Sequence, residues 1–250
     1  MKIKKSAKIL LLLLLLSVTI GFVKKKQDGR VCNQIVIEID NQYGNYFIDE
    51  NEIRSLITAN GAEYIVGEDF ADIPLKKLEQ QLEAHKYVQQ AEVYRDLQGK
   101  LTAKVEQSRP IARILRQDAP EAYISAEGEI LPLSERYTAR VMLIDGSYAD
   151  RLIRHSLVKD ERNHQIFELL KFIDNDEFWK AQIAQLDIDS EGDIIIYPQV
   201  GKQYIEFGKA EQIGEKFSKL AIFYQKILPF KGWNTYNRVN LKYFNQIVCE

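Results

Sequence analysis

The stretch IPLKKLEQQLEAHKYVQQAEVYRDLQGKLTAKV, residues 73–105, carries the clearest structural signal in the chain. Pro74 suits the first turn of a helix, and three leucines follow it at helical spacing until His85. These leucines are Leu75, Leu78 and Leu82. Beyond His85, two apolar runs alternate with polar neighbours on either side of the turn Gln98-Gly99-Lys100. This stretch therefore predicts a helix followed by a β-hairpin.

One more strand and one more helix precede this stretch. Ile35 to Ile39 is a short run rich in β-branched residues, which predicts a strand. Asp49 then opens a helix, because Glu52 three residues later completes a capping-box pattern, and Gly61 stops it. Residues 31–108 thus predict a small domain with the order strand, helix, helix, strand, strand.

Residues 109–250 predict a second domain that is mainly β with inserted helices. Pro110 favours an extended joint between the two domains. Short apolar runs bounded by turn residues predict strands at 122–124, 130–131, 141–144, 186–188, 194–197, 204–207, 239–242 and 246–249. Helical spacing predicts helices at 166–173, at 178–184 and from Glu211 to Leu228. The predicted class is α+β, with a mixed, mainly antiparallel sheet in the second domain.

The N-terminus holds an uncharged, largely apolar run from Ile9 to Val23, which lysines close on both sides. As a helix this run spans about 22 Å, less than the ~30 Å hydrocarbon core, but lysine stems extend the effective span. A signal peptide is the competing interpretation, and its cleavage needs small residues that do not follow Val23. We expect an uncleaved transmembrane helix at residues 9–23 in the lipid bilayer of the cytoplasmic (inner) membrane. The tail at residues 1–8 is then cytoplasmic and the body lies outside the cytoplasm.

Charge is distributed unevenly along the chain. Residues 1–26 contain seven lysines and no acid, so the rest of the chain holds 27 basic and 36 acidic side chains, a net charge of −9. Binding to nucleic acid needs basic surface that replaces phosphate counterions. The acidic body therefore predicts no nucleic-acid partner.

Residues suited to catalysis or metal binding are sparse. The histidines His85, His155 and His164 lie in no HExxH pattern, and the chain has no CxxC pair, G-x-S-x-G elbow or phosphate-binding glycine loop. Asp187 to Asp193 resembles the opening of a calcium-binding EF-hand loop, but Pro198 stands where that loop needs a bidentate glutamate. We expect a polar turn there, no metal or cofactor, and no enzymatic activity.

The two cysteines, Cys32 and Cys249, lie near opposite ends of the body. Spacing alone does not place two cysteines within bonding reach. A single pair also implies no disulfide framework, so a disulfide bridge and two separate thiols both stay open.

Several segments, in their order along the chain, resemble the FtsQ/DivIB family of bacterial cell-division proteins. Residues 73–93 are similar to the second helix and following strand of that family's POTRA domain. Residues 97–105 resemble its P-x-x-L-x-I-x-V segment, and residues 106–112 resemble its E-x-x-P-I-A junction shifted by one position. Residues 189–196 and 205–209 resemble the strands before its last helix, and Asn240-Leu241-Lys242-Tyr243 resembles its closing D-L-R-Y motif. The departures are an asparagine in place of the acid and lysine in place of arginine.

The resemblance implies a bitopic scaffold of the divisome, which recruits and links division proteins at the septum. The family forms a complex with two small bitopic coiled-coil proteins of the FtsB and FtsL kind, and its POTRA domain recruits other division proteins. One alternative is a POTRA module of an outer-membrane assembly or secretion system, but residues 109–250 do not supply the many-stranded barrel that it needs. Another is a secreted enzyme of unknown type, which needs a cleavage site and a polar cluster that the sequence does not show.

The resemblance also implies that the partner site lies on the last helix and the last strands. An added strand from the partner would cover the C-terminal strand, where Ile247 and Val248 are apolar and β-branched. Lys209 and Lys242 match basic family positions that pair with acidic residues of the partner. The expected partner-binding residues are Lys209, Tyr224, Lys242, Tyr243, Gln246, Ile247 and Val248. The alternative is that this strand only closes the sheet and the lysines are solvated.

Overall fold

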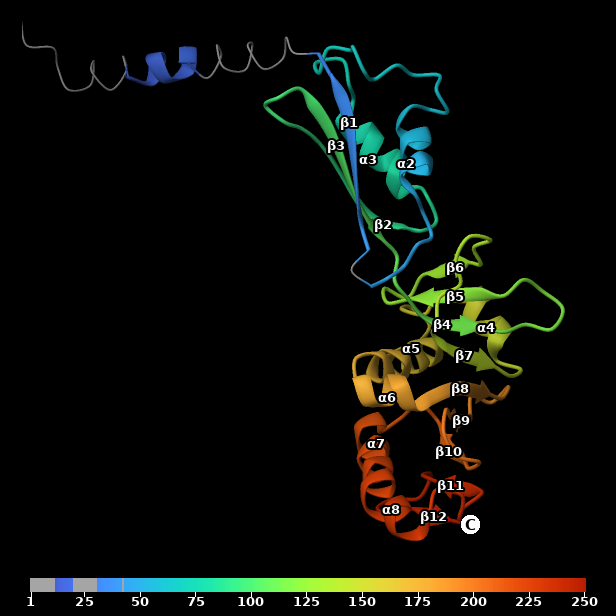
Figure 1. Ribbon diagram of the computed structural model, residues 1–250. Helices are drawn as coiled ribbons and strands as arrows, with labels where there is room; N and C mark the ends of the chain where they lie inside the picture. The colour runs from blue at the N-terminus through green and yellow to red at the C-terminus, as the bar shows by residue number, and fades with distance from the viewer. Residues whose placement is uncertain (1–11, 20–30, 42) are drawn as a thin grey trace, which may run out of the picture. The chain divides into compact units, whose positions relative to one another are not determined.

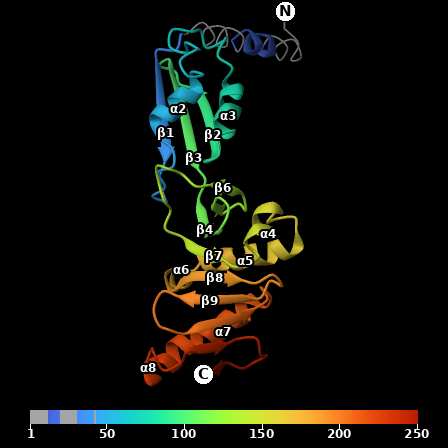
Figure 2. The same cartoon turned by 90° about the vertical axis from the view of Figure 1, so that its right-hand side faces the viewer.

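The computed structural model describes residues 12–19, 31–41 and 43–250 (Figures 1 and 2). The chain divides into two compact units between Gln107 and Ser108. The first unit combines a small sheet with two helices, and the second is built on a larger sheet. The predicted α+β class is therefore confirmed.

Residues 12–19 are helical, and their leucine side chains are more than half exposed. Within the three described ranges, no helix has both the length and the apolar character that crossing a bilayer requires. The predicted tail at residues 1–8 and two parts of the predicted span, residues 9–11 and 20–23, lie outside the described residues. The membrane anchor stays a prediction.

The first unit is a three-stranded sheet against which two helices pack (Figure 1). Its elements are β1 (Gln34–Asp40), α2 (Glu50–Ile57), α3 (Leu75–Glu83), β2 (Val88–Arg95) and β3 (Lys100–Gln107). Strand β3 lies in the middle, parallel to β1 and antiparallel to β2. The elements follow one another in the predicted order.

Local signals set the start of both helices. Asp49 caps α2, because its carboxylate accepts a hydrogen bond from the backbone N–H of Glu52 at 2.8 Å. Pro74 precedes α3, where the N–H that it lacks would have no partner inside the helix. The core between helices and sheet consists of side chains at most 1% exposed: Ile53, Ile57, Leu78, Leu82, Leu101, Ala103 and Val105.

The second unit is a nine-stranded sheet with the order β12-β11-β10-β9-β8-β7-β4-β5-β6. Its strands are β4 (Pro110–Ile114), β5 (Ala122–Ser125), β6 (Ile130–Pro132), β7 (Met142–Asp145), β8 (Ile183–Ile188), β9 (Ile194–Pro198), β10 (Tyr204–Gly208), β11 (Arg238–Asn240) and β12 (Val248–Cys249). Parallel pairing joins β4 to β7, β7 to β8 and β10 to β11, and all other neighbours are antiparallel. The sheet is mixed and mainly antiparallel, as predicted.

Helices cover one side of this sheet. They are α4 (Ala149–Arg154), α5 (Glu161–Asp174), α6 (Glu177–Gln182), α7 (Ile213–Ile222), the π-helix η1 (Phe223–Ile227) and α8 (Leu228–Lys231). Figure 1 shows α5, α6, α7 and α8 along the same side of β8 to β12. In β9, Ile194 and Ile196 are at most 1% exposed, whereas Tyr197 is 38% exposed. This alternation indicates one face packed against helices and one face toward solvent.

Two helices of the second unit differ from the prediction. Helix α6 ends at Gln182, and Ile183 begins β8, where it pairs with Pro198 of β9. A short apolar run fits a helix and a buried strand equally well, and here its last residues form a strand of the sheet. The helix predicted from Glu211 to Leu228 begins at Ile213 and is interrupted by η1. The π-helix has no local sequence signal.

The last two strands are shorter than predicted, and one strand and one helix of this unit were not predicted. Strand β11 ends at Asn240, because the Asn240 side chain accepts the backbone N–H of Lys242 at 2.9 Å and turns the chain. Strand β12 contains only Val248 and Cys249, so Gln246 and Ile247 precede it. Strand β4 and helix α4 have no counterpart in the prediction.

We expect residues 31–107 to fold in isolation, because this unit has an aliphatic core of its own and its size is small but feasible for a domain. Circular dichroism of the isolated fragment should show a cooperative thermal transition. A fragment that melts without a transition would mean that the two units depend on each other.

Candidate partner-binding site

The C-terminal end of the chain forms one edge of the nine-stranded sheet. Strand β12 pairs with β11, with Val239 opposite Cys249 and Asn240 opposite Val248. On the other side of β12, no described residue belongs to a neighbouring strand. Ile247, Val248 and Cys249 are half-buried, so this edge is apolar and partly exposed. Such an edge accepts a further strand unless something covers it.

Hydrogen bonds determine which backbone groups of this edge point outward. The N–H of Glu250 donates to the carbonyl of Arg238, and the N–H of Arg238 donates to the carbonyl of Glu250, both at 3.0 Å. Successive residues of a strand direct their N–H and C=O groups to opposite sides. Within β12, Cys249 therefore directs its N–H and C=O groups away from β11, toward the place where an added strand would lie.

A polar network fastens β12 to β11 and β10. The guanidinium of Arg238 donates to both carboxylate oxygens of Glu206, at 2.8 and 3.0 Å, and to Glu250 at 2.9 Å. Asn240 adds a hydrogen bond to Glu206 at 2.6 Å. The hydrogen bonds from Arg238 hold the pKa of the Glu206 carboxyl below its ordinary value, and those to Glu206 and Glu250 raise the pKa of Arg238. Glu206 and Arg238 therefore stay charged at neutral pH. No sequence motif points to Arg238 or Glu206 as site residues.

Lys209 and Lys242 lie together where β10 leads into α7. Gly208 has a φ of +73°, and a Cβ at this position would lie 3.2 Å from Cγ of Lys242, so the lysine stem crosses the glycine. The ammonium of Lys209 donates to the carbonyl of Glu191 and lies 3.2 Å from the carboxylate of Asp193. Lys242 is exposed and forms no ion pair with any residue that the structure describes. Of the two predicted cations, Lys242 is the one available to a partner.

Two further lysines of α7 are engaged with backbone carbonyls. Lys216 is 7% exposed, donates to the carbonyl of Lys209 at 2.8 Å and lies 4.6 Å from the ring centroid of Phe207. Burial lowers the pKa of Lys216. Lys219 donates to the carbonyl of Tyr243 at 2.8 Å. These two lysines position the segments that carry Lys209 and Tyr243.

The loop between β11 and β12 exposes aromatic surface. Tyr243 is 54% exposed and Phe244 is 71% exposed, and Gln246 is exposed beside them. Asn245 adopts a left-handed conformation with φ +52°, which reverses the chain toward β12. Aromatic residues are enriched at protein interfaces, so this loop extends the candidate site beyond the edge strand. No sequence motif points to Phe244 as a site residue.

Two family descriptions match the chain. Residues 109–250 match "FtsQ/DivIB, C-terminal related", and residues 30–106 match "POTRA-like domain". The first match alone covers more than half of the 250 residues. The chain belongs to the FtsQ/DivIB family. This is a family of non-enzymatic scaffolds of bacterial cell division, and it is the family that the sequence resembles. A comparison with curated proteins gives no match.

In this FtsQ/DivIB-family chain, Tyr224 lies inside the domain. It is 4% exposed, and its ring lies 5.7 Å from that of Phe223, 6.0 Å from that of Trp179 and 6.1 Å from that of Trp233. Burial raises the pKa of the Tyr224 hydroxyl. Its predicted role as a partner contact does not fit this position, because a buried ring offers no surface. Tyr224 instead helps to hold η1 in the core.

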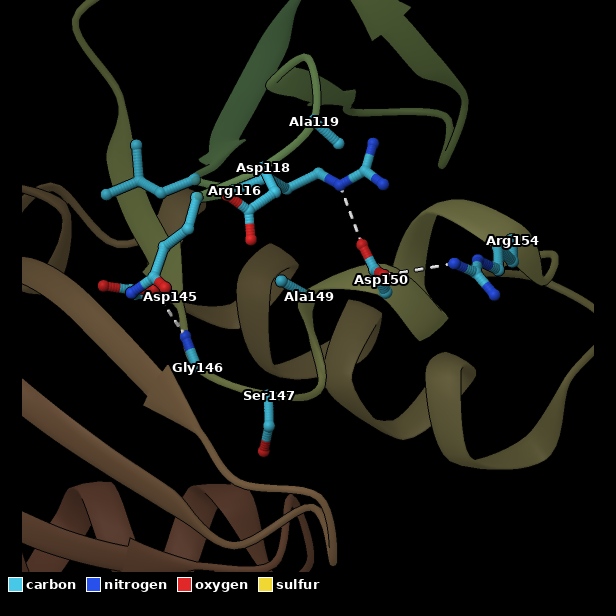
Figure 3. A pocket seen from close by; sticks show the side chains of 11 residues that line it. Arg116, Asp118, Ala119, Asp145, Gly146, Ser147, Ala149, Asp150 and Arg154 are labelled. Carbon is cyan, nitrogen blue, oxygen red and sulfur yellow. Dashed lines mark hydrogen bonds and ion pairs between the residues drawn. The ribbon is translucent and has the colours of Figure 1, made fainter.

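The second unit also contains a pocket of about 660 Å³ at the carboxyl ends of β4 and β7 (Figure 3). Arg116 and Arg154 both pair with Asp150 across it, at 2.8 and 3.2 Å. Ser147 also lines the pocket, but Figure 3 shows its side chain pointing away from Arg116 and Asp150, and none of the described lining residues is a histidine or a cysteine. A serine needs a neighbouring base to act as a nucleophile, and the carboxylate of Asp150 is already paired with both arginines.

The turn that resembles a calcium loop joins β8 to β9. One carboxylate oxygen of Asp189 accepts the backbone N–H groups of Glu191 and Asp193, both at 2.9 Å. The carboxylate of Asp193 pairs with Lys209. Among the described residues, no three metal-ligating side chains gather in one place. Hydrogen bonds and an ion pair thus already occupy two of the carboxylates.

Calcium is expected to bind this turn no more tightly than millimolar, because the bidentate glutamate is missing and the carboxylate of Asp189 already accepts two backbone N–H groups of the turn. Calorimetric titration of the purified chain with calcium measures this directly. Micromolar binding that Asp189→Ala abolishes would contradict it.

The two cysteines are free thiols in different units, Cys32 buried and Cys249 half-buried. Burial raises the pKa of each thiol above its ordinary value. Reactive cysteines have a lowered pKa, so these two are poor nucleophiles at neutral pH. They contribute to packing rather than to chemistry.

Proposed function

We propose that the chain is a single-pass scaffold of the division machinery, and that it links other division proteins through its C-terminal edge strand. The observation that carries the proposal is the outer side of β12, where Cys249 directs its backbone N–H and C=O groups away from β11 and no described strand pairs with it. The membership in the FtsQ/DivIB family supports the setting in cell division.

In this proposal a partner strand adds to β12 by β-augmentation. Main-chain hydrogen bonds to Cys249 supply affinity, and an acidic side chain of the partner meets Lys242 and sets the register. Each charge-assisted contact contributes about 1–3 kcal/mol when desolvated and near zero when exposed. Tyr243 and Phe244, both more than half exposed, would pack against the partner beside the strand.

The partners that fit are the small bitopic coiled-coil proteins of the division complex. The partner would carry an acidic residue close to the segment that adds to β12 as a strand. The POTRA-like domain recruits further division proteins in the same proposal. Residues 9–23 anchor the scaffold in the cytoplasmic membrane at the division site, so that both domains work outside the cytoplasm. A membrane anchor on each partner would favour pairing, because it raises their effective concentration.

The proposal predicts that Lys242→Glu weakens the complex about tenfold or more, because it replaces attraction with repulsion at the register contact. The thermal unfolding temperature should change little, since Lys242 is exposed and its charge interacts with Glu206 only as a minor Coulombic contribution that solvent screens. A pull-down of the full-length chain with the small bitopic coiled-coil proteins of the same cell, followed by titration, measures the change.

Lys231→Glu is the matched control, because Lys231 is an exposed lysine at the end of α8 and away from the junction of β10 and α7. Lys209→Glu is less informative, because that change also breaks contacts with Glu191 and Asp193. Equal binding by the Lys242→Glu and Lys231→Glu chains would exclude the register contact.

A further inference from the structure

The three-stranded sheet of the first unit has two edges, β1 and β2, and side chains of the protein itself close one of them. The carboxylate of Glu79 accepts the backbone N–H of Val93 at 2.9 Å, and that of Glu83 accepts the backbone N–H of Ala91 at 3.4 Å. Both glutamates belong to α3. Helix α3 thus covers the outward N–H groups of β2, and a strand can add there only after displacing two carboxylates.

The other edge is closed only at its start. The N–H of Cys32 donates to the carbonyl of Glu68, and its carbonyl accepts the N–H of Gly67, at 2.8 and 2.7 Å. Because Cys32 faces outward and backbone groups alternate, Gln34, Val36 and Glu38 face outward as well. No described residue bonds to the backbone of Val36 or Glu38 on that side.

The side chains along this edge select a particular occupant. Ile37 and Ile39, which point toward the helices, are only half-buried, so an added strand could cover them with apolar side chains. Glu38 and Asp40 point to the opposite face and are exposed acids. An added strand would cover the isoleucines on one face with apolar side chains and pair with the acids on the other face through basic side chains. Such a strand carries apolar residues at every second position and basic residues between them.

We propose that the free edge of β1 is a second docking site, which takes an extended partner segment of alternating apolar and basic residues. A second copy of this chain is a poorer occupant, because pairing β1 with β1 would bring two sets of acids to one face. The site lies in the POTRA-like domain and does not depend on the edge strand β12.

The test uses the full-length chain and a fluorescent peptide of alternating valine and lysine, with an alternating valine and glutamate peptide as the reference. Val36→Pro removes an outward N–H without touching the ladder between β1 and β3, and an edge position tolerates proline. We expect it to lower the affinity for the basic peptide about tenfold relative to Val36→Ala, as the loss of main-chain bonding predicts.

A matched pair of charge-reversal variants tests the role of charge. Lys104 of β3 lies between Glu38 of β1 and Glu92 of β2, so the two glutamates have the same neighbour but lie on opposite edge strands. Glu38→Lys should weaken binding of the basic peptide about tenfold, and Glu92→Lys, beside the closed edge, should leave it within about twofold. Lys242→Glu and Cys249→Pro should leave it unchanged, which separates this site from the C-terminal one.

Three outcomes would overturn the proposal. One is equal loss for Glu38→Lys and Glu92→Lys, which would indicate attraction by net charge alone. Another is equal binding by Val36→Pro and Val36→Ala. The third is a dimer of the full-length chain in analytical ultracentrifugation that Val36→Pro dissociates, which would make a second copy the occupant.

Discussion

Replacing Cys249 with proline is expected to lower the affinity for the small bitopic partners about tenfold or more. The N–H of Cys249 points away from β11, so proline removes a donor that a partner strand would use. The bonds between Arg238 and Glu250 that hold β12 in place are not affected. One lost main-chain bond accounts for roughly 1 kcal/mol, and the proline ring also obstructs the approach of the strand. Titration of the full-length chain with the purified partner measures the loss.

Cys249→Ala is the control for this change, because the Cys249 side chain packs against the core and its loss could itself disturb the edge. The alanine variant should bind within about twofold of the unchanged chain, and both variants should unfold at similar urea concentrations. If proline and alanine reduce binding equally, the partner does not bond to this backbone, and the POTRA-like domain becomes the better site.

The largest loss of stability is expected from Phe217→Ala, at about 3–5 kcal/mol in the free energy of unfolding. Phe217 is 2% exposed, and its ring lies 4.7 Å from that of Phe172, 4.9 Å from that of Trp179 and 5.5 Å from that of Phe207. These rings join α7 to α5, α6 and β10. Truncation leaves a cavity that rigid aromatic neighbours cannot fill.

Both tryptophans of the chain, Trp179 and Trp233, lie in the second unit, so tryptophan fluorescence during urea unfolding follows that unit alone. Ile222→Ala on the same helix is the control, because Ile222 is 54% exposed and its truncation should change the free energy by no more than about 0.5 kcal/mol. Similar values for the two variants would show that α7 is not held by its aromatic contacts.

Local patterns predicted the elements whose signals lie within a few residues. The cap at Asp49 formed as the sequence indicated, because the two groups that bond are three residues apart. The alternating runs of β2, β3 and β9 became strands, since each has a turn of glycine and polar residues at its end. The resemblance to the FtsQ/DivIB family rested on such motifs in their order, and the family match confirms it.

Other features of the candidate site depend on contacts between distant segments. The apolar run at Ile183 fits either a helix or a strand. It forms a strand because it pairs with β7 on one side and with β9 on the other. Tyr224 falls at helical spacing with other apolar residues, but which side of that helix the core covers is not a local property. Arg238 and Glu206 form their ion pair because β10 and β11 pair in parallel, and no sequence motif predicts that pairing.

The sequence by itself determined the family, the α+β class and most of the strands and helices, because caps, turns and alternation act over short distances. Only the tertiary structure decided which strands lie at an edge, which lysine is available and which edge of the first sheet is closed. Whether a strand lies at an edge depends on the strand order. That order is set by how all strands and helices together bury their apolar side chains, and no single element determines it. The free backbone groups of β12 and β1 are therefore visible only in the folded chain.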